Sequence, residues 1–582
     1  QSESCGKCAP CRLGTTQLLE ILSRITQGRG RPKDVETIRE IGRTVAEASL
    51  CGLGQNCAKP ALSTLEYFIR EYENHIQEKR CDGAVCDAMV ISACQHACPA
   101  GIDVPNYVAA VGRGEYEKAV AIIRERNPFP AVCGHICIHP CEFKCRRGEL
   151  DEPVAIRSIK RTAAEWFFEN IGPERDPFPV TREEEVAVVG AGPAGLSCAY
   201  FLAQMGYQTT VFEAKDVAGG MLGLALPEFR LPREVIQMEI DYIQNCGVRI
   251  EYNAPIAAEH TVNDLLNEGF GAVFIAAGAQ ASKQLGIPGE SEDLDNLTYG
   301  LPYLNEVKAG MHHAFSGKTV VIGGGNVAVD VARTALRDGA AEVLLVCLEP
   351  RDEMPAWEKE VKEALEEGVQ IHPSWLPSRI VREGSRATGV EFARCTAVFD
   401  QDGRFNPACD PGDTWFLPAE HIIVSIGQAL DMDFLSDEER LERELWGGLA
   451  VDNNTLATNI QGVFAGGDFT TGPTFAIRAI ASGRRAALAI HNSFSGISGK
   501  IEIPDEKSPL KLDAPLALEN EEQADKPRVP PKLEAPQDRT QDFRIVELGL
   551  SLDDARQEAY RCLRCDLEKE AEYDQIDNPA EA

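Results

Sequence analysis

The 582-residue chain is short of basic side chains, since 58 lysines and arginines face 91 aspartates and glutamates, giving a net charge of −33. Nucleic acids and anionic membrane surfaces would repel such a chain, so we expect neither as a partner. Its apolar runs stay below the roughly 18 to 20 residues of a membrane-spanning helix, and we expect no membrane insertion. The first residues lack the basic stretch and apolar core of a secretory signal, so we expect a cytoplasmic protein.

Cysteine, in contrast, is abundant. The chain holds 20 cysteines, and in a reducing compartment such a number favours metal binding over disulfides. Thirteen lie between residues 5 and 145, and two lie near the C-terminus. Five are isolated and are expected to be ordinary thiols: Cys198, Cys246, Cys347, Cys395 and Cys409. At roughly 150 residues per domain, the length predicts about three to five domains.

The first cysteine group is a closely spaced triplet, Cys5, Cys8 and Cys11. A loop with this spacing offers three thiolates to a [4Fe–4S] cluster, and a fourth comes from elsewhere in the chain. Two helix-like stretches, 15–27 and 34–48, would return the chain to the triplet at Cys51, the predicted fourth ligand. Four cysteines also suit zinc, although the triplet spacing is typical of iron–sulfur sites.

The segments that carry these cysteines read Ser-Cys-Gly-Lys-Cys-Ala-Pro-Cys-Arg-Leu-Gly at 4–14 and Ser-Leu-Cys-Gly-Leu-Gly-Gln at 49–55. About residues 1–79 resemble the C-terminal cluster domain of the NADH-binding flavoprotein subunit of complex I and of related hydrogenases. The flavin-binding domain that precedes it in that family has no counterpart in this sequence. The resemblance therefore implies a helical [4Fe–4S] domain and a docking surface, not an FMN site.

A second cysteine group spans two segments, with Cys94 and Cys98-Pro99 in the first and a regular series in the second: Cys133, Cys137, Cys141 and Cys145. Cysteine followed by proline is typical of ferredoxin cluster loops. Both segments are similar to the N-terminal domain of the glutamate synthase small (beta) subunit, which also occurs in dihydropyrimidine dehydrogenase and in bifurcating ferredoxin:NADP oxidoreductases. The resemblance implies two [4Fe–4S] clusters in a helical domain over about residues 80–175.

The sequence departs from that family before Cys94, where a Cys-x-x-Cys pair is missing. The C-terminus carries such a pair, Cys562 and Cys565. Our hypothesis is that the tail folds back, so that one cluster uses Cys94, Cys145, Cys562 and Cys565 and the other uses Cys98, Cys133, Cys137 and Cys141. The alternative is that the tail pair is an independent redox pair or metal clip.

Three cysteines are left over near one histidine: Cys57, Cys81, Cys86 and His75. Three thiolates and an imidazole suit tetrahedral zinc, although the spacing is not that of a standard finger. The alternative is three free thiols beside an ordinary polar helix residue. Both interpretations stay open at the level of the sequence.

Two glycine fingerprints predict two α/β dinucleotide-binding folds. In the first, a buried strand leads to the loop glycines Gly190, Gly192 and Gly195, and a second strand over 209–212 ends at Glu213. The glycines let a pyrophosphate approach the helix N-terminus, and the acid accepts a hydrogen bond from a ribose hydroxyl. The second fingerprint begins at Thr319 and has the loop residues Gly323, Gly325, Asn326 and Ala328. Two nucleotide sites in one chain favour a flavin together with a nicotinamide. A flavin can exchange a hydride with the nicotinamide and single electrons with iron–sulfur clusters.

A further resemblance indicates which of the two folds binds FAD and which binds the nicotinamide. Val-Phe-Ala-Gly-Gly-Asp-Phe-Thr at 463–470 looks like the second FAD motif of flavoproteins with two dinucleotide domains, and it implies FAD contacts at Gly467, Asp468 and Thr474. We therefore expect helical iron–sulfur domains followed by two Rossmann-like domains. The FAD domain covers 180–285 and 420–495, and the NAD(P) domain at 286–419 is inserted in it. Residues 227–230 lie in the region that lines the flavin in the family. A linker at 496–543 leads to a tail at 544–582, with a short helix predicted over 551–562.

The choice of nicotinamide depends on Leu348 and Glu349. NADPH-using relatives have paired arginines there, which hold the 2′-phosphate. A carboxylate would repel that phosphate and accept from a free 2′-hydroxyl, so Glu349 favours NAD(H). Arg351 and Arg333 lie close in sequence and keep NADP(H) open.

Together these features predict an iron–sulfur flavoprotein subunit of a multisubunit oxidoreductase. It would exchange hydride between NAD(P)H and FAD, and single electrons between FAD, three [4Fe–4S] clusters and a partner redox subunit, with ferredoxin as one candidate. No catalytic side chain is expected, because the chemistry depends on placing nicotinamide over flavin. Two alternatives stay open: an electron-bifurcating NAD(P)H/ferredoxin complex, and a non-catalytic electron-wire subunit.

Overall fold

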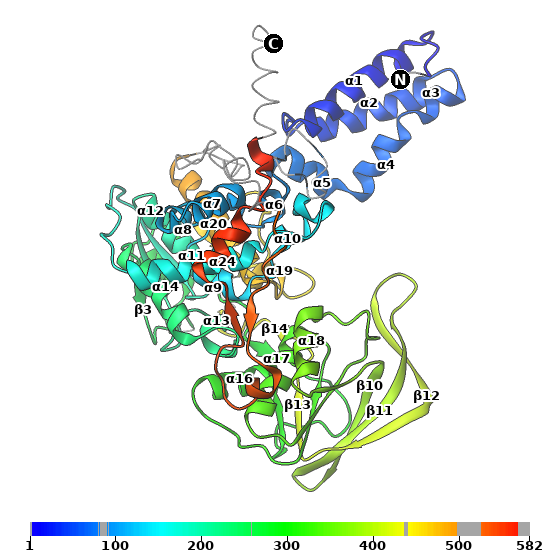
Figure 1. Ribbon diagram of the computed structural model, residues 1–582. Coiled ribbons are helices and arrows are strands. Elements are labelled where there is room, and N and C mark those ends of the chain that lie inside the picture. The colour runs from blue at the N-terminus through cyan, green and yellow to red at the C-terminus, as the bar shows by residue number, and fades with distance from the viewer. Residues whose placement is uncertain are drawn as a thin grey trace.

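The computed structural model describes residues 3–78, 81, 86, 90, 92–257, 259–435, 440–496 and 525–567. Helices fill the first third of the chain, two parallel sheets follow, and the C-terminal segment runs back over both (Figure 1). Among the described residues, no helix combines the length and the apolarity that crossing a bilayer requires.

The N-terminal helices extend away from both sheets (Figure 1). They are α1 (Ala9–Thr26), α2 (Asp34–Ala48), α3 (Gly52–Asn56), α4 (Lys59–Tyr67), α5 (Ile69–Glu73) and a π-helical turn at Asn74–Glu78. Leu18, Ile21 and Ile25 recur on one face of α1 and pack with Ile38 of α2 in one small core. The helices cross closely, since a Cβ on Gly14 would lie 2.1 Å from Val45 Cγ2. This hairpin carries the chain from the cysteine triplet to the loop at residue 51.

A second helical domain follows. It consists of α6 (Ala93–Ala97), α7 (Val104–Gly112), α8 (Tyr116–Arg124), α9 (Pro130–Ile136), α10 (Pro140–Phe143), a 3₁₀ turn at Arg146–Glu149 and α11 (Ile156–Asn170). Gly134 of α9 lets the backbone of α11 approach, because a Cβ there would lie 2.6 Å from Arg161 Cα. Glu239 of the predicted FAD domain accepts hydrogen bonds of 2.8 and 3.0 Å from the N–H groups of Ala131 and Val132. These contacts fix α9 between α11 and the flavin domain.

The first parallel sheet has the order β15-β4-β1-β2-β3. Its strands are β1 (Glu185–Val189), β2 (Gln208–Phe212), β3 (Arg249–Glu251), β4 (Ala272–Ile275) and β15 (Val463–Ala465). The associated helices are α12 (Pro193–Gln204), α13 (Met221–Leu224), α14 (Arg233–Asn245), α15 (Val262–Asn267), α19 (Asp468–Thr471) and α20 (Ala476–Phe494). Val186, Ala187 and Val188 are fully buried, as expected for a strand covered on both faces.

The second parallel sheet has the order β6-β13-β7-β8-β9. Its strands are β6 (Leu297–Tyr299), β7 (Lys318–Ile322), β8 (Glu342–Val346), β9 (Gln370–His372) and β13 (His421–Val424), and its helices are α16 (Gly300–Lys308), α17 (Asn326–Arg337) and α18 (Glu358–Glu366). An antiparallel sheet of β10 (Trp375–Glu383), β11 (Arg386–Phe399) and β12 (Phe405–Pro418) lies beside it (Figure 1). The glycine fingerprint of the second dinucleotide fold does not predict this additional sheet.

The crossover between the two domains lies later than the sequence predicts. Strand β13 pairs with β6 and β7, so residues 421–424 belong to the predicted NAD(P) domain and not to the second segment of the predicted FAD domain. The chain crosses where β5 (Ala281–Ser282) pairs with β14 (Gln428–Ala429). A short buried strand cannot be assigned to either sheet without its neighbours, and the boundary at 420 therefore shifts to about 428.

The C-terminal segment crosses both halves of the molecule. It contains β16 (Lys532–Leu533), α23 (Pro536–Arg539), β17 (Glu547–Gly549) and α24 (Leu552–Ala559). In Figure 1 the red chain runs from beside α16 to α24, which lies against the second helical domain. The predicted helix at 551–562 corresponds to α24, and part of the predicted linker, 528–543, is packed on the surface of the domains. We call residues 528–549 the C-terminal strap.

Candidate functional site

The loop after β1 forms a cradle of closely packed backbone. Gly190 has a φ of 101°, a left-handed conformation that favours glycine. A Cβ on Gly195 would lie 2.0 Å from the carbonyl oxygen of Gly190, so only glycine fits at the start of α12. Glu213, at the end of β2, is buried and accepts a 2.8 Å hydrogen bond from the N–H of Ala191. The predicted acid therefore lies directly against the loop, as a dinucleotide fold requires.

Two further backbone segments approach this loop. A Cβ on Gly220 would lie 2.9 Å from Gly192 Cα, and one on Gly467 would lie 2.9 Å from Ala194 Cβ. Asp468 accepts hydrogen bonds from Thr474, 3.0 Å from its N–H and 2.9 Å from its hydroxyl. Burial raises the pKa of Asp468, and the bonds from Thr474 oppose that rise. The residues predicted to bind FAD thus meet at one end of the first sheet; they lie at 190–195, 213 and 467–474. Their backbones approach one another closely, which fits a bound pyrophosphate.

The second fingerprint has the same arrangement with a different third residue. Gly323 packs under the carbonyl of Ser425, since a Cβ would lie 2.1 Å from that oxygen. Ala328 is fully buried in α17 and takes the place of the third glycine. Gly325 has no neighbour within 4 Å of an added Cβ, so its outer side is open. Asn326 accepts a 2.8 Å hydrogen bond from the N–H of Trp357, which ties the loop to the segment before α18.

Glu349 faces this glycine loop. A Cβ on Gly324 would lie 2.6 Å from its Oε2. That oxygen is buried and has no hydrogen-bond partner among the described residues. Burial raises the pKa of the Glu349 carboxyl. A buried acceptor without a donor beside a nucleotide loop fits the hydroxyl of a bound ribose.

Arg333 and Arg351, the two arginines that could have bound the 2′-phosphate of NADP(H), form ion pairs with glutamates instead. Arg333 is 1% exposed and forms ion pairs of 2.9 and 2.7 Å with Glu363 and Glu367. Arg351 binds Glu358 through hydrogen bonds of 3.1 and 3.0 Å. Arg333 thus lies inside the domain as a structural cation, a placement that its position in the sequence did not reveal.

The segment at 227–230, associated with the flavin in the sequence, contacts the nicotinamide domain. Phe229 is buried under the guanidinium of Arg337, 4.0 Å from its ring centroid. Arg230 forms ion pairs of 2.7 and 2.5 Å with Asp330 and Glu360. This segment therefore joins the two dinucleotide domains.

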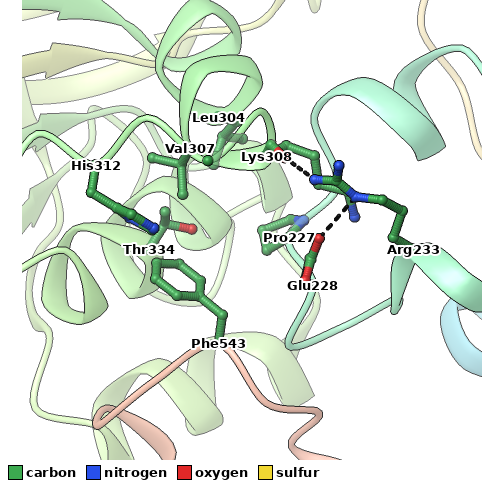
Figure 2. A pocket seen from close by; sticks show the side chains of 10 residues that line it. Pro227, Glu228, Arg233, Leu304, Val307, Lys308, His312, Thr334 and Phe543 are labelled. Carbon is green, nitrogen blue, oxygen red and sulfur yellow. Dashed lines mark hydrogen bonds and ion pairs between the residues drawn. The ribbon is translucent and has the colours of Figure 1, made fainter. Parts of the chain in front are cut away.

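A cavity of about 150 Å³ lies at this joint (Figure 2). It is lined by Pro227, Glu228, Arg233, Leu304, Val307, Lys308, Gly310, His312, Thr334 and Phe543. Lys308 donates a 3.2 Å hydrogen bond to the carbonyl of Leu231, and burial lowers the pKa of its ammonium to about 8. The lining contains none of the predicted nucleotide residues among those described, so the cavity lies apart from both cradles.

The structure brings together the four thiols predicted to share a cluster with the tail: Cys94, Cys145, Cys562 and Cys565. Burial raises the pKa of the Cys94 thiol, and the neighbouring thiols of Cys562, Cys145 and Cys565 raise it further. Burial also raises the pKa of Cys562, to about 12. Two buried arginines beside the tail cysteines anchor the tail. Arg561 binds Asp151 at 2.8 Å and Glu558 at 2.7 Å, and Arg564 binds Asn106 at 3.2 Å.

The second quartet also neighbours Tyr107, whose hydroxyl donates to the carbonyl of Ile156 at 3.4 Å. Burial raises the pKa of Tyr107, as do thiols of both quartets, Cys141, Cys98 and Cys94. Burial lowers the pKa of the Lys160 ammonium on α11, but the thiols of this group outweigh it and raise that pKa: Cys98, Cys133, Cys137 and Cys141. Sequence reasoning missed Lys160, because a lysine in a helix normally indicates a solvated face.

At the N-terminus the cysteine triplet meets the loop of Cys51. A backbone hydrogen bond from Leu50, the residue before Cys51, lowers the pKa of the Cys8 thiol. Cys11 is buried and Cys5 and Cys51 are exposed. Cys57 also lies here, since burial and the neighbouring thiol of Cys11 raise its pKa.

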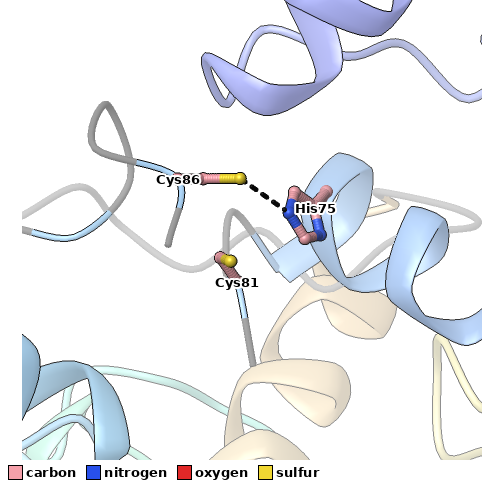
Figure 3. A group of neighbouring side chains, drawn as sticks. All are labelled: His75, Cys81 and Cys86. Carbon is pink, nitrogen blue, oxygen red and sulfur yellow. Dashed lines mark hydrogen bonds between the residues drawn. The ribbon is translucent and has the colours of Figure 1, made fainter. Parts of the chain in front are cut away.

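This position separates Cys57 from its predicted zinc partners. His75, Cys81 and Cys86 form a compact group, with ligand atoms within 4.8 Å of one another (Figure 3). His75 Nε2 lies 3.3 Å from the Cys86 Sγ, and its Nδ1 lies 2.6 Å from the carbonyl oxygen of Glu71. The second contact fixes the imidazole with Nε2 toward the thiols, which is the usual arrangement of a metal-binding histidine. The structure differs from the sequence prediction in giving three ligands there, because α3 places Cys57 beside α1.

Comparison with known families divides the chain into three parts. The pyridine nucleotide-disulphide oxidoreductase family matches residues 184–483. The NADH-ubiquinone oxidoreductase-F iron-sulfur binding region matches residues 1–75, and dihydropyrimidine dehydrogenase domain II, 4Fe-4S cluster, matches residues 61–171.

Two relatives match nearly the whole chain, and a third matches about three quarters of it. The NADP(+)-dependent formate dehydrogenase subunit beta of Moorella thermoacetica is 37% identical over 97% of this chain and 88% of its own. The NADPH-Fe(3+) oxidoreductase subunit beta of Geobacter sulfurreducens is 34% identical over 96% of this chain and 88% of its own. The glutamate synthase (NADPH) small chain of Azospirillum brasilense is 30% identical over 74% of this chain and 93% of its own.

Proposed function

The chain belongs to the pyridine nucleotide-disulphide oxidoreductase family, and we propose that it is the subunit that carries electrons between NAD(P)H and the redox subunits of a larger complex. The matches confirm both family resemblances seen in the sequence. The observation that carries the proposal is the presence of two dinucleotide cradles and two groups of four neighbouring thiols in one chain. The relatives are named as subunits of formate dehydrogenase and of an NADPH-Fe(3+) oxidoreductase, which supports other redox subunits as partners.

FAD, when bound, supplies hydride exchange with a nicotinamide and single-electron exchange with clusters. The residues of the first cradle would hold it. The N–H groups at the start of α12 would bind the pyrophosphate, and Glu213 would accept from a ribose hydroxyl while it also accepts from the N–H of Ala191. Thr474 donates to Asp468 and would hold that carboxylate in place for the cofactor. The residues of the second cradle would hold the nicotinamide nucleotide. No side chain needs to transfer a proton in this scheme, so positioning is the main task of the protein.

The clusters are assigned from donor chemistry. Four neighbouring thiols suit a [4Fe–4S] cluster. We place one cluster at Cys94, Cys145, Cys562 and Cys565 and another at Cys98, Cys133, Cys137 and Cys141. A third cluster would use Cys5, Cys8, Cys11 and Cys51. The position of the tail pair beside Cys94 supports a shared site over an independent redox pair.

The nicotinamide is NAD(H) in our proposal. The unpaired Oε2 of Glu349 beside Gly324 supports a free 2′-hydroxyl, and the ion pairs of Arg333 leave it unavailable to a 2′-phosphate. The opposing argument is that the relatives are named for NADP(+) or NADPH. Glu349 lies in the site itself, and we give its charge more weight than the relatives' names.

The group of His75, Cys81 and Cys86 would bind one zinc ion. Imidazole and thiolate are preferred zinc ligands, and three of them leave a fourth position for water or another residue. The compact geometry supports a structural site between the N-terminal helices and the second helical domain.

One anaerobic experiment tests the function. The purified chain, loaded with FAD and iron, is mixed with NADH or NADPH while flavin absorbance and cluster EPR signals are followed. We expect flavin bleaching followed by cluster reduction, and about twelve iron atoms per chain. An absence of bleaching with both nucleotides would favour the non-catalytic wire, and coupled ferredoxin reduction would favour bifurcation.

A further inference from the structure

Two cysteines outside the thiol quartets lie opposite one another in the additional antiparallel sheet. Cys395 of β11 pairs in register with Cys409 of β12, and both are thiols in the structure. In a regular antiparallel ladder, the Cα atoms of opposite residues are roughly 4.5 to 5.5 Å apart. This separation lies within the roughly 4.4 to 6.8 Å that disulfides span. Sequence spacing did not indicate the pair, because it depends on how β11 and β12 are aligned.

The backbone at Cys395 favours a close approach of the two side chains. Its N–H donates a 3.0 Å hydrogen bond to the carbonyl of Ser374, which directly precedes β10. Because β10 and β12 lie on opposite sides of β11, this N–H points away from Cys409. Opposite residues that do not exchange both backbone hydrogen bonds form the closer type of antiparallel pair, with Cα atoms about 4.5 Å apart. Their side chains lie on the same face of the sheet.

The two thiols are also electrostatic neighbours, and they differ in exposure. Burial raises the pKa of the Cys395 thiol, and the neighbouring charges of Glu349 and Cys409 raise it further. Cys395 is 9% exposed, whereas Cys409 is exposed on the edge strand of the sheet. A small solute can therefore reach Cys409 directly, and Cys395 is shielded from it.

We propose that Cys395 and Cys409 are a reversible redox site, which closes to a cross-strand disulfide when it meets a low-molecular-weight disulfide, RSSR. The Cys409 thiolate attacks one sulfur of RSSR, which forms a mixed disulfide and releases RS⁻. Cys395 then loses its proton and attacks the Cys409 sulfur, which releases the second RS⁻. Two protein thiols and RSSR thus become one protein disulfide and two RSH, and RSSR takes up two electrons and two protons.

This inference goes beyond the proposed function, since it needs neither a bound nucleotide nor a cluster. Closure would fasten the edge strand β12 to β11. A disulfide lowers the entropy of the opened hairpin, so the hairpin should open less often. We expect the amide hydrogens of β12 beside Cys409 to exchange about tenfold or more slowly in the oxidised protein.

The test uses the full, cofactor-loaded chain, held without oxygen in mixtures of reduced and oxidised glutathione. After alkylation of the remaining thiols, trypsin cleaves after Arg394, Arg404 and Arg440 and so separates the two cysteines. Mass spectrometry should find peptides 395–404 and 405–440 joined in mixtures rich in oxidised glutathione, and separate after reduction. Each peptide contains one cysteine, so the joined pair identifies the bond.

Three variants accompany the wild type. Cys409→Ser should give no joined peptides, and its β12 amides should exchange at the same rate in every mixture. Cys395→Ser should accumulate a glutathione adduct on Cys409, because the second step is blocked. The double variant Ala408→Cys, Cys409→Ser moves the thiol by one residue to the opposite face of the strand, so it should not close.

Three outcomes would overturn the inference. In the first, both wild-type peptides stay separate and fully alkylated at every glutathione ratio. In the second, a glutathione adduct persists on Cys409 of the wild type, because Cys395 then fails to reach it. In the third, the double variant joins its peptides as readily as the wild type, because the bond would then not depend on the register of β11 and β12.

Discussion

The carboxylate of Glu547 accepts hydrogen bonds of 2.6 and 2.5 Å from one nitrogen of Arg157, on α11 of the second helical domain. The same carboxylate binds Lys359 on α18 of the nicotinamide domain. One residue of the C-terminal strap therefore connects the domain that carries the thiol quartets to the domain that would hold the nicotinamide. The same segment continues to Cys562 and Cys565, so strap packing and tail-cysteine placement are linked.

Replacing Glu547 should loosen the strap. The carboxylate is mostly buried, and its basic neighbours lower its pKa to about 2 against the opposing effect of burial. In Glu547→Gln we expect the free energy of local opening at β17, measured by hydrogen exchange, to fall by about 3 kcal/mol at neutral pH. Glu444→Gln, at an exposed position, is the control and should change nothing.

The same ion pair predicts a pH dependence. The folded pKa of Glu547 lies below the unfolded value, so its contribution is complete above about pH 4.5 and is lost as pH falls toward 2. The difference in opening free energy between wild type and Glu547→Gln should therefore shrink as pH is lowered through this window. A difference that stays constant from pH 7 to 3.5 would contradict the assignment.

Removing the tail thiols tests the shared cluster. The double variant Cys562→Ser, Cys565→Ser should lose about four of about twelve iron atoms, because two of four ligands disappear. Cys409→Ser, an exposed thiol outside both quartets, is the control. Unchanged iron content in the double variant would show that the tail pair is an independent site.

Glu349 should determine nucleotide preference. In Glu349→Ala we expect kcat/KM for NADH to fall by about tenfold or more, the effect of a lost hydrogen bond to a charged acceptor, while kcat/KM for NADPH holds or rises. Glu383→Gln, at an exposed position on β10, is the control. A wild-type preference for NADPH would refute our choice of NAD(H).

The two glycine loops should respond differently to alanine. Gly325 has a φ of −92° and open space beside it, so Gly325→Ala should keep the wild-type Tm and raise KM for the nicotinamide. A Cβ on Gly195 would meet the carbonyl of Gly190 at 2.0 Å, so Gly195→Ala should lower both Tm and FAD content. Wild-type FAD content and Tm in Gly195→Ala would contradict the close packing of this loop.

Metal analysis tests the three-residue group. Wild type should contain about one zinc per chain, and Cys86→Ser should lose it with iron unchanged. Cys57→Ser should keep its zinc, because Cys57 lies beside Cys11. Zinc loss in Cys57→Ser would restore the four-ligand site that the sequence predicts.

The sequence by itself determined the features that depend on short spacings. The residues of a glycine loop, a following helix and an acid after the next strand are near neighbours along the chain, and local geometry alone brings Gly190, Gly195 and Glu213 together. The same holds for α2, which spans the predicted residues 34–48. Family resemblance then supplied the order of the flavin and nicotinamide domains.

Tertiary structure decided how residues far apart in the chain are grouped. The packing of α3 places Cys57 beside Cys11, and ion pairs within the nicotinamide domain engage Arg333. In the sequence, only the missing Cys-x-x-Cys pair before Cys94 suggested that the tail cysteines fold back. In the structure, the buried arginines of the tail and the C-terminal strap show where the tail lies. Lys160 had no sequence signal, because the environment of a helical lysine depends on which helices surround it.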